Sequence, residues 1–203
     1  MSSLGNRDKQ LLLEVARCAL TLAAEGRESP GTLPQDAALV ESIGAFVTLR
    51  KRGGLRGCIG QIDSGQSLAE VVAHCAKSAA LNDSRFEPVR VEELGEIEIE
   101  LSVLSPLAEI VPERIEVGKH GLVVSAGLRR GVLLPQVAVE CRWTGEQFLE
   151  QTCIKAGLER NAWRDPETKV EGFTAQVFAE SDFRSGELPG PKDRAKPRYS
   201  IST

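Results

Sequence analysis

Two short apolar segments joined by adjacent glycines constrain the fold of this chain more than any other feature of its sequence. Residues 45–50 read Ala-Phe-Val-Thr-Leu-Arg, and residues 55–60 read Leu-Arg-Gly-Cys-Ile-Gly. Between them, Gly53-Gly54 suits a two-residue hairpin turn, because the tight turns between antiparallel strands need positive φ. The sequence therefore predicts an antiparallel hairpin in which Arg50 pairs with Gly57 and Thr48 pairs with Ile59.

The second segment has features of a functional site as well as of a strand. Glycine weakens a strand unless something approaches its backbone closely, so Gly57 and Gly60 are candidate ligand contacts. Side chains alternate along a strand, which places Arg56 and Cys58 on one face. A neighbouring cation lowers the pKa of a thiol, and the thiolate is the nucleophile. Arg56 is therefore a candidate ligand contact and Cys58 a candidate catalytic residue; alternatively, Cys58 is a small core residue and Arg56 closes a salt bridge.

Two further residues outside this strand are candidates. His120 lies in a glycine-bounded turn, where a general base or ligand would sit, and it is a second candidate catalytic residue. Arg85 follows a predicted helix and either joins Arg56 in an anion pocket or clamps its own loop through Asp83 or Glu87. No zinc-ligand spacing, phosphate-binding loop or dinucleotide fingerprint occurs, so the sequence indicates no metal site and no particular cofactor.

The remaining pattern predicts an α+β fold, with a mainly antiparallel sheet flanked by helices. Capping boxes at Ser67–Glu70 and Thr144–Gln147 open two helices. Apolar periodicity predicts another helix over 8–25, and 35–42 has the length of one or two helical turns. Strands are predicted over 96–103, 122–125, 132–135 and 172–179, and residues 115–121 are predicted to form a short strand and a glycine-bounded turn. Pro135 lies at a strand end, a bulge or an edge.

Composition limits the classes of protein that this chain can belong to. Its 203 residues include 41% hydrophobic and 27% charged residues, as in ordinary globular proteins, and its net charge of −4 argues against nucleic acid as a partner. No apolar run is long enough for a membrane span, and no signal peptide is evident. Five scattered cysteines without a C-x-x-C pair are typical of the reducing cytoplasm. Residues 184–203 are rich in proline, small polar and basic residues, which predicts a disordered tail after a domain over 1–183.

Several stretches together resemble one family, the AMMECR domain family. These stretches are 46–49, 55–60, 83–86 with Pro88, 98–106, 118–122, 133–138 and 153–158. The resemblance runs from the first helix to about Phe183. It implies an α+β fold of two unequal subdomains, with the hexapeptide at a cleft. It also implies that the protein is a component of a system that includes a Memo-like protein and a radical-SAM protein.

The sequence is compatible with three functions. The first is an enzyme or enzyme component that binds an anionic, nucleotide-like small molecule at the hexapeptide. The second is a non-catalytic scaffold or partner subunit for the Memo-like and radical-SAM proteins. The third is RNA binding through Arg50, Lys51, Arg52, Arg56 and the basic tail, although a basic hairpin is usually just a solvated turn.

Overall fold

The computed structural model describes residues 4–28, 43–62 and 65–183, which divide into two compact units. Unit 1 contains the chain up to Leu104 and again from Gln176, and unit 2 is Ser105–Ala175. The chain thus leaves unit 1 once and returns to it. The predicted tail at 184–203 and the predicted helical turns at 35–42 lie outside the described residues.

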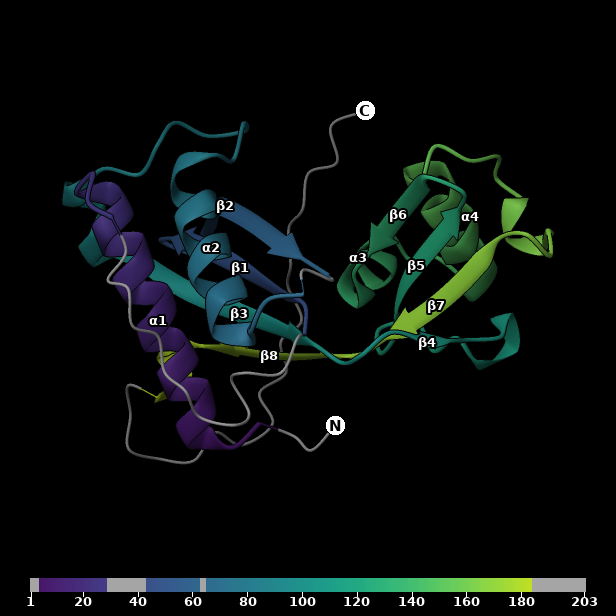
Figure 1. Ribbon diagram of the computed structural model, residues 1–203, viewed down its shortest axis with the longest axis horizontal. Coiled ribbons are helices and arrows are strands. Elements are labelled where there is room, and N and C mark those ends of the chain that lie inside the picture. Colours follow the sequence, from purple (N-terminus) through teal and green to yellow (C-terminus); the bar gives the residue numbers. More distant parts are fainter. Residues whose placement is uncertain (1–3, 29–42, 63–64, 184–203) are drawn as a thin grey trace. The chain divides into compact units, whose positions relative to one another are not determined.

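Unit 1 is a four-stranded sheet with two helices on one face (Figure 1). The strands are ordered β2-β1-β3-β8, and β1 pairs antiparallel with both β2 and β3. Helix α2 packs on β1, β2 and α1, while α1 also contacts β3. The elements of this unit are α1 (Asn6–Ala24), β1 (Ala45–Lys51), β2 (Gly54–Gln61), α2 (Leu68–Leu81), η2 (Val91–Glu96), β3 (Ile97–Leu104), β8 (Ala175–Ala179) and η5 (Glu180–Phe183).

Alternation along the strands builds the core of unit 1. On β3, Ile97, Ile99, Leu101 and Val103 are buried, as the sequence predicts for a strand with one face on a core. Helix α2 begins with the predicted capping box, in which the Ser67 hydroxyl accepts a hydrogen bond from the Glu70 amide. The core therefore lies between this face of the sheet and the two helices.

Unit 2 is a second four-stranded sheet, ordered β4-β7-β5-β6, with antiparallel pairing throughout. Helix α4 packs against β5 and β6 and buries Phe148 and Leu149. The elements are β4 (Ala108–Glu109), η3 (Pro112–Arg114), β5 (Gly121–Ala126), β6 (Arg129–Leu133), α3 (Pro135–Glu140), α4 (Gly145–Lys155), η4 (Ala162–Arg164) and β7 (Lys169–Phe173). Two antiparallel sheets flanked by helices confirm the predicted α+β class. Among the described residues, no helix is both long and apolar enough to cross a membrane.

The predicted register of the first hairpin is wrong. Thr48 pairs with Cys58 and Leu49 with Gly57, and Arg56 has no partner on β1 because a bulge shifts the register there. The turn is centred on Arg52 and Gly53, whose φ angles are 52° and 80°. Both central residues of a type I′ turn need positive φ, so the turn begins one residue before Gly53-Gly54.

Two predicted strands also differ from those observed. The predicted turn before β5 is present, but residues 115–120 include no strand, because Gly118 adopts a φ of 88° and the amides of Lys119 and His120 donate to the Glu116 carbonyl; Gly121 already belongs to β5. The predicted strand at 172–179 is two strands, β7 and β8, separated by Thr174. The single alternation predicted across it fails, since Val177 is exposed and Phe178 is buried.

Pro135 follows the end of β6 and begins a helix that the sequence pattern did not predict. The ring fixes φ at a helical value, and the missing amide is no loss at the first position of a helix. Residues Pro135–Glu140 accordingly form α3.

We expect Gly57→Ala to destabilise unit 1 by about 1–3 kcal/mol, because its Cβ would force helix and strand apart. The Cβ would lie 2.3 Å from the Ala79 carbonyl oxygen of α2. Urea unfolding would measure the change. Gly54→Ala on the same strand is the matched control, since its Cβ would meet nothing closer than 3.5 Å. Equal stability of the two variants would contradict the packing argument.

Candidate functional site

The hexapeptide is strand β2, at an edge of the unit 1 sheet. Its two glycines are required by packing inside the protein. A Cβ on Gly57 would meet the Ala79 carbonyl, and a Cβ on Gly60 would lie 2.1 Å from the Phe46 ring. The space that these glycines leave is thus occupied by α2 and by Phe46. Their presence in the strand therefore needs no ligand to explain it.

Arg56 braces the loop that follows α2. Its Nε and Nη2 donate to the two carboxylate oxygens of Glu93 at 3.1 and 3.0 Å, in a bidentate pair. Nη1 donates to the Glu87 carbonyl at 2.9 Å, and Nη2 also approaches the Pro88 carbonyl at 3.3 Å. The side chain is only 14% exposed. This geometry matches the alternative in which Arg56 closes a salt bridge.

Glu93 forms ion pairs with two cations, Arg56 and Lys51. The hydrogen bonds from Arg56, the Arg90 amide and Lys51 hold the pKa of Glu93 well below its ordinary value. Lys51 Nζ lies 2.9 Å from the same carboxylate that binds Arg56. Sequence reasoning missed Glu93, because it lies 37 positions from Arg56 in a run of acidic residues with no distinguishing spacing.

The four basic residues of the hairpin are all paired with acids. Arg50 pairs with Glu100 and Arg52 with Glu96, while Lys51 and Arg56 share Glu93. Proteins bind the phosphate backbone of a nucleic acid through Lys and Arg side chains that neutralise its phosphates, and an arginine or lysine already paired with an acid is less suited to this. The hairpin therefore gives no support to RNA binding.

Cys58 lies beside a clip formed by Asp83 and Arg85. The Cys58 amide donates to Asp83 Oδ2 at 2.8 Å, and Arg85 Nη2 approaches the Cys58 carbonyl at 3.4 Å. Arg85 holds the same carboxylate through Nε at 2.9 Å and Nη2 at 2.7 Å. The pair therefore takes up the outward backbone groups of an edge strand, which otherwise invite pairing with another chain. Of the two roles considered for Arg85, the structure shows the clamp on Asp83.

The Cys58 side chain is half-buried and contacts Thr48, with 3.3 Å between Sγ and Oγ1. Burial raises the pKa of Cys58 above its ordinary value, and this effect outweighs the hydrogen bond with Thr48 and the positive charge of Arg85. Arg56 was expected to lower the pKa of Cys58, but it has no part in the shift. The cation that lowers this pKa is Arg85. The surroundings favour the neutral thiol, which is a poor nucleophile.

His120 lies in unit 2, in the turn before β5. Its Nδ1 accepts a hydrogen bond from the Glu116 amide at 3.0 Å, while its own amide donates to the Glu116 carbonyl. A backbone amide is only a donor, so Nδ1 carries no proton and the neutral ring is protonated at Nε2. In this state, His120 can donate a hydrogen bond from Nε2, but it cannot accept a proton there as a general base.

Within the described ranges, no group of three or more His, Cys, Asp and Glu residues is placed to hold a metal ion. Five of the six sequence-predicted residues lie on or beside β2, and the structure brings Cys58 and Arg85 together there. Arg56 directs its hydrogen bonds to a different set of partners. The sequence marked Asp83 as a possible partner of Arg85 but did not indicate its bond to the Cys58 amide.

Asp83→Asn should lower the free energy of unfolding by roughly 2–3 kcal/mol at pH 7. The Arg85 hydrogen bonds, followed by that of the Cys58 amide, lower the pKa of Asp83 to about 2, and its side chain is 5% exposed. Because the folded-state pKa is depressed, the stabilisation is complete above the unfolded-state pKa of about 4 and disappears as the pH falls towards 2.

Unfolding experiments from pH 7 to pH 2 would therefore show the two proteins converging in stability as the pH falls. Glu92→Gln, a change of an exposed carboxylate in η2, is the control. A difference between wild type and Asp83→Asn that is the same at pH 7 and pH 2.5 would contradict the linkage.

Alkylation at neutral pH should label Cys58 more slowly than Cys18. Cys18 is exposed, whereas Cys58 is half-buried and burial raises its pKa. Mass spectrometry of tryptic peptides would give both rates, with Cys58→Ser to identify the peptide. If Cys58 were the fastest cysteine to react at pH 7, its thiol would be an activated thiolate, and the prediction of a neutral thiol would be wrong.

Comparison with known proteins identifies the family. The AMMECR1 family matches residues 13–178. A protein of Methanothermobacter thermautotrophicus is 43% identical over 185 residues, which cover 86% of this chain and 96% of that protein. A protein of Aquifex aeolicus is 37% identical over 183 residues, which cover 86% of this chain and 94% of that one.

A solved structure agrees with these sequence matches. The crystal structure of the uncharacterized protein PH0010 from Pyrococcus horikoshii aligns with a TM-score of 0.73 and 40% identity. The alignment covers 83% of this chain and 89% of that structure. From the match over most of its length and from these relatives, we conclude that the chain belongs to the AMMECR1 family.

Proposed function

We propose that this protein binds a small anionic molecule at the outer edge of β2, beside Cys58 and Arg85. The observation that carries the proposal is the placement of Arg85. Its guanidinium is held against the Cys58 carbonyl by Asp83, yet 51% of its side chain is exposed. A guanidinium that is fixed in direction and open to solvent on one side is suited to planar, hydrogen-bonded anions.

Arg56 and Arg85 have different roles in this site from those that the sequence suggested. Arg56 is nearly buried, with every guanidinium nitrogen bonded to Glu93, Glu87 or Pro88, so its part is to brace the loop. Arg85 is the better candidate for contact with the ligand. The ring of Phe86 lies 5.5 Å from the Arg85 guanidinium and adds an apolar surface next to the charge.

In this proposal, Cys58 contributes a neutral thiol and not a nucleophile. It is half-buried and lies between Thr48 and the Asp83–Arg85 clip. A thiol is a weak hydrogen-bond donor and a polarizable apolar contact. The site thus favours binding, and the proposal includes no covalent step.

A component that binds a ligand without transforming it would act together with other proteins. The Memo-like and radical-SAM partners that the family resemblance implies stay a prediction, as does a cytoplasmic location. All five cysteines are free thiols, which fits a reducing compartment.

Titration of the ¹⁵N-labelled protein with inorganic phosphate and with adenosine monophosphate would test the proposed site. We expect saturable shifts of the Cys58 and Arg85 amides, and we expect Arg85→Gln to weaken binding by at least about fivefold, because a hydrogen bond to a charged group is lost.

Arg52→Gln is the matched control, because Arg52 is a more exposed arginine of the same unit, at 79%. Its effect should stay below about twofold, as for a surface ion pair. Thermal melting of each variant would establish that it is folded. An equal loss in both variants would mean nonspecific attraction, and the absence of saturable shifts would remove the proposal.

A further inference from the structure

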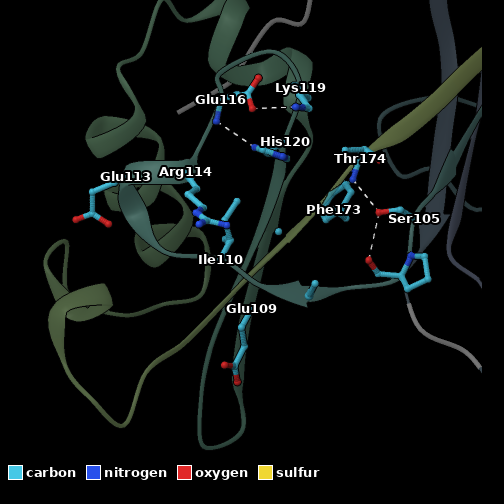
Figure 2. Close-up of a pocket in the computed structure, with 13 residues that line it drawn as sticks. Ser105, Glu109, Ile110, Glu113, Arg114, Glu116, Lys119, His120, Phe173 and Thr174 are labelled. Atoms are coloured by element: carbon cyan, nitrogen blue, oxygen red, sulfur yellow. Dashed lines mark hydrogen bonds and ion pairs between the residues drawn. The ribbon is translucent and has the colours of Figure 1, made fainter. Parts of the chain in front are cut away.

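A cavity in unit 2 lies outside the site proposed above. It has a volume of about 500 Å³ and lies between the segment around β4, the η3 turn, the 116–120 turn and the end of β7 (Figure 2). This volume is within the range of small-molecule sites. Pro106, Ala108, Ile110 and Phe173 contribute apolar surface to it.

His120 supplies a hydrogen-bond donor of fixed direction to this cavity. The Glu116 backbone binds His120 twice, through the amide donated to Nδ1 and through the carbonyl that accepts the His120 amide. These bonds set the neutral tautomer, which carries its proton at Nε2. His120 is among the residues that line the cavity, and no hydrogen bond in the part of the chain that the structure describes occupies this N–H, so it is the ring's remaining polar group for a ligand.

Arg114 supplies a cation that the protein itself does not use. Its side chain is exposed, and within the described residues it makes no hydrogen bond or ion pair. Lys119, in contrast, is paired with Glu116 at 2.8 Å. In Figure 2, the Arg114 guanidinium projects towards the middle of the lining residues and the His120 ring lies against the Glu116 backbone, while the carboxylates of Glu109 and Glu113 project outwards.

The charge of the lining limits what can bind. Three carboxylates (Glu109, Glu113 and Glu116) and two fixed cations (Arg114 and Lys119) give a net charge of −1 with neutral His120. Such surroundings disfavour a dianion such as a phosphate monoester and accept a single negative charge at the guanidinium. The guanidinium fork matches a carboxylate, and the apolar side chains match a short aliphatic chain.

We propose that this cavity binds a small organic monocarboxylate, with Arg114 and the His120 Nε2–H on its carboxylate and Ile110 beside its aliphatic chain. The site belongs to unit 2 and does not depend on the proposed function at Cys58 and Arg85. Arg114 would thus have a binding role, although it belongs to no recognised sequence motif.

Titration of the full-length ¹⁵N-labelled protein with valerate would test this proposal. Valerate should shift the Arg114, His120 and Gly172 amides saturably and move the His120 Nε2 resonance. Arg114→Gln should weaken binding by at least about tenfold, since a hydrogen bond between two charged groups is removed. Lys119→Gln is the control for general electrostatics, and it should change the affinity by less than about twofold because Glu116 already neutralises this lysine.

Two further ligands identify the chemical class. Acetate, which lacks the longer apolar chain, should bind at least about fivefold more weakly than valerate. Inorganic phosphate should not compete with valerate. Absence of saturation by valerate, equal effects of Arg114→Gln and Lys119→Gln, equal affinity for acetate and valerate, or competition by phosphate would each overturn the proposal. All of these readouts are separate from the shifts at Cys58 and Arg85.

Discussion

The bond between the Asp83 carboxylate and the Cys58 amide joins the edge of the unit 1 sheet to the loop that follows α2. β2 is an edge strand, so its outward backbone groups have no strand to pair with. Asp83 and Arg85 supply an acceptor and a donor in the place of that strand. Without them, the loop would still be attached to β2 through Arg56, but the backbone groups of Cys58 would be open to other chains.

Carboxylates determine what the arginines of this unit can do. Glu93 fixes Arg56 in a bidentate pair, and Asp83 fixes Arg85 in another. The two pairs differ in exposure, since Arg56 is 14% and Arg85 51% exposed. An arginine that is paired and nearly buried stabilises the structure, while one that is paired but open to solvent can also meet a ligand. This difference moves the proposed anion contact from Arg56 to Arg85.

In unit 2, one arginine has no acidic partner within the described residues, and a nearby imidazole is oriented by the backbone. The turn at 116–120 uses the Glu116 backbone to orient His120 and the Glu116 carboxylate to occupy Lys119. Arg114 is then left as the unpaired cation within the described part of the cavity wall. A monocarboxylate would complete this arrangement, because it brings one negative charge and an apolar chain to a cavity that already contains several acids.

Elements whose signals are local are predictable from the sequence. The capping boxes at Ser67 and Thr144 and the antiparallel α+β class are confirmed, and so is the alternation along β3 as far as Leu101, after which Ser102 and Leu104 are buried as well. The hexapeptide was correctly placed on the second strand of a hairpin. These features are predictable because their energies depend on residues a few positions apart.

The register of that hairpin and the partners of its side chains were not predictable from the local pattern. The contact of Gly57 with α2 and the pairing of Arg56 with Glu93 join residues far apart in the chain, and the bulge at Arg56 lies on the same strand as these contacts. The same holds for Cys58, whose pKa is raised by burial although a cation lies nearby. Desolvation depends on everything packed around a group, so a local pattern of thiol, cation and glycines predicted where these residues lie but not their chemical state.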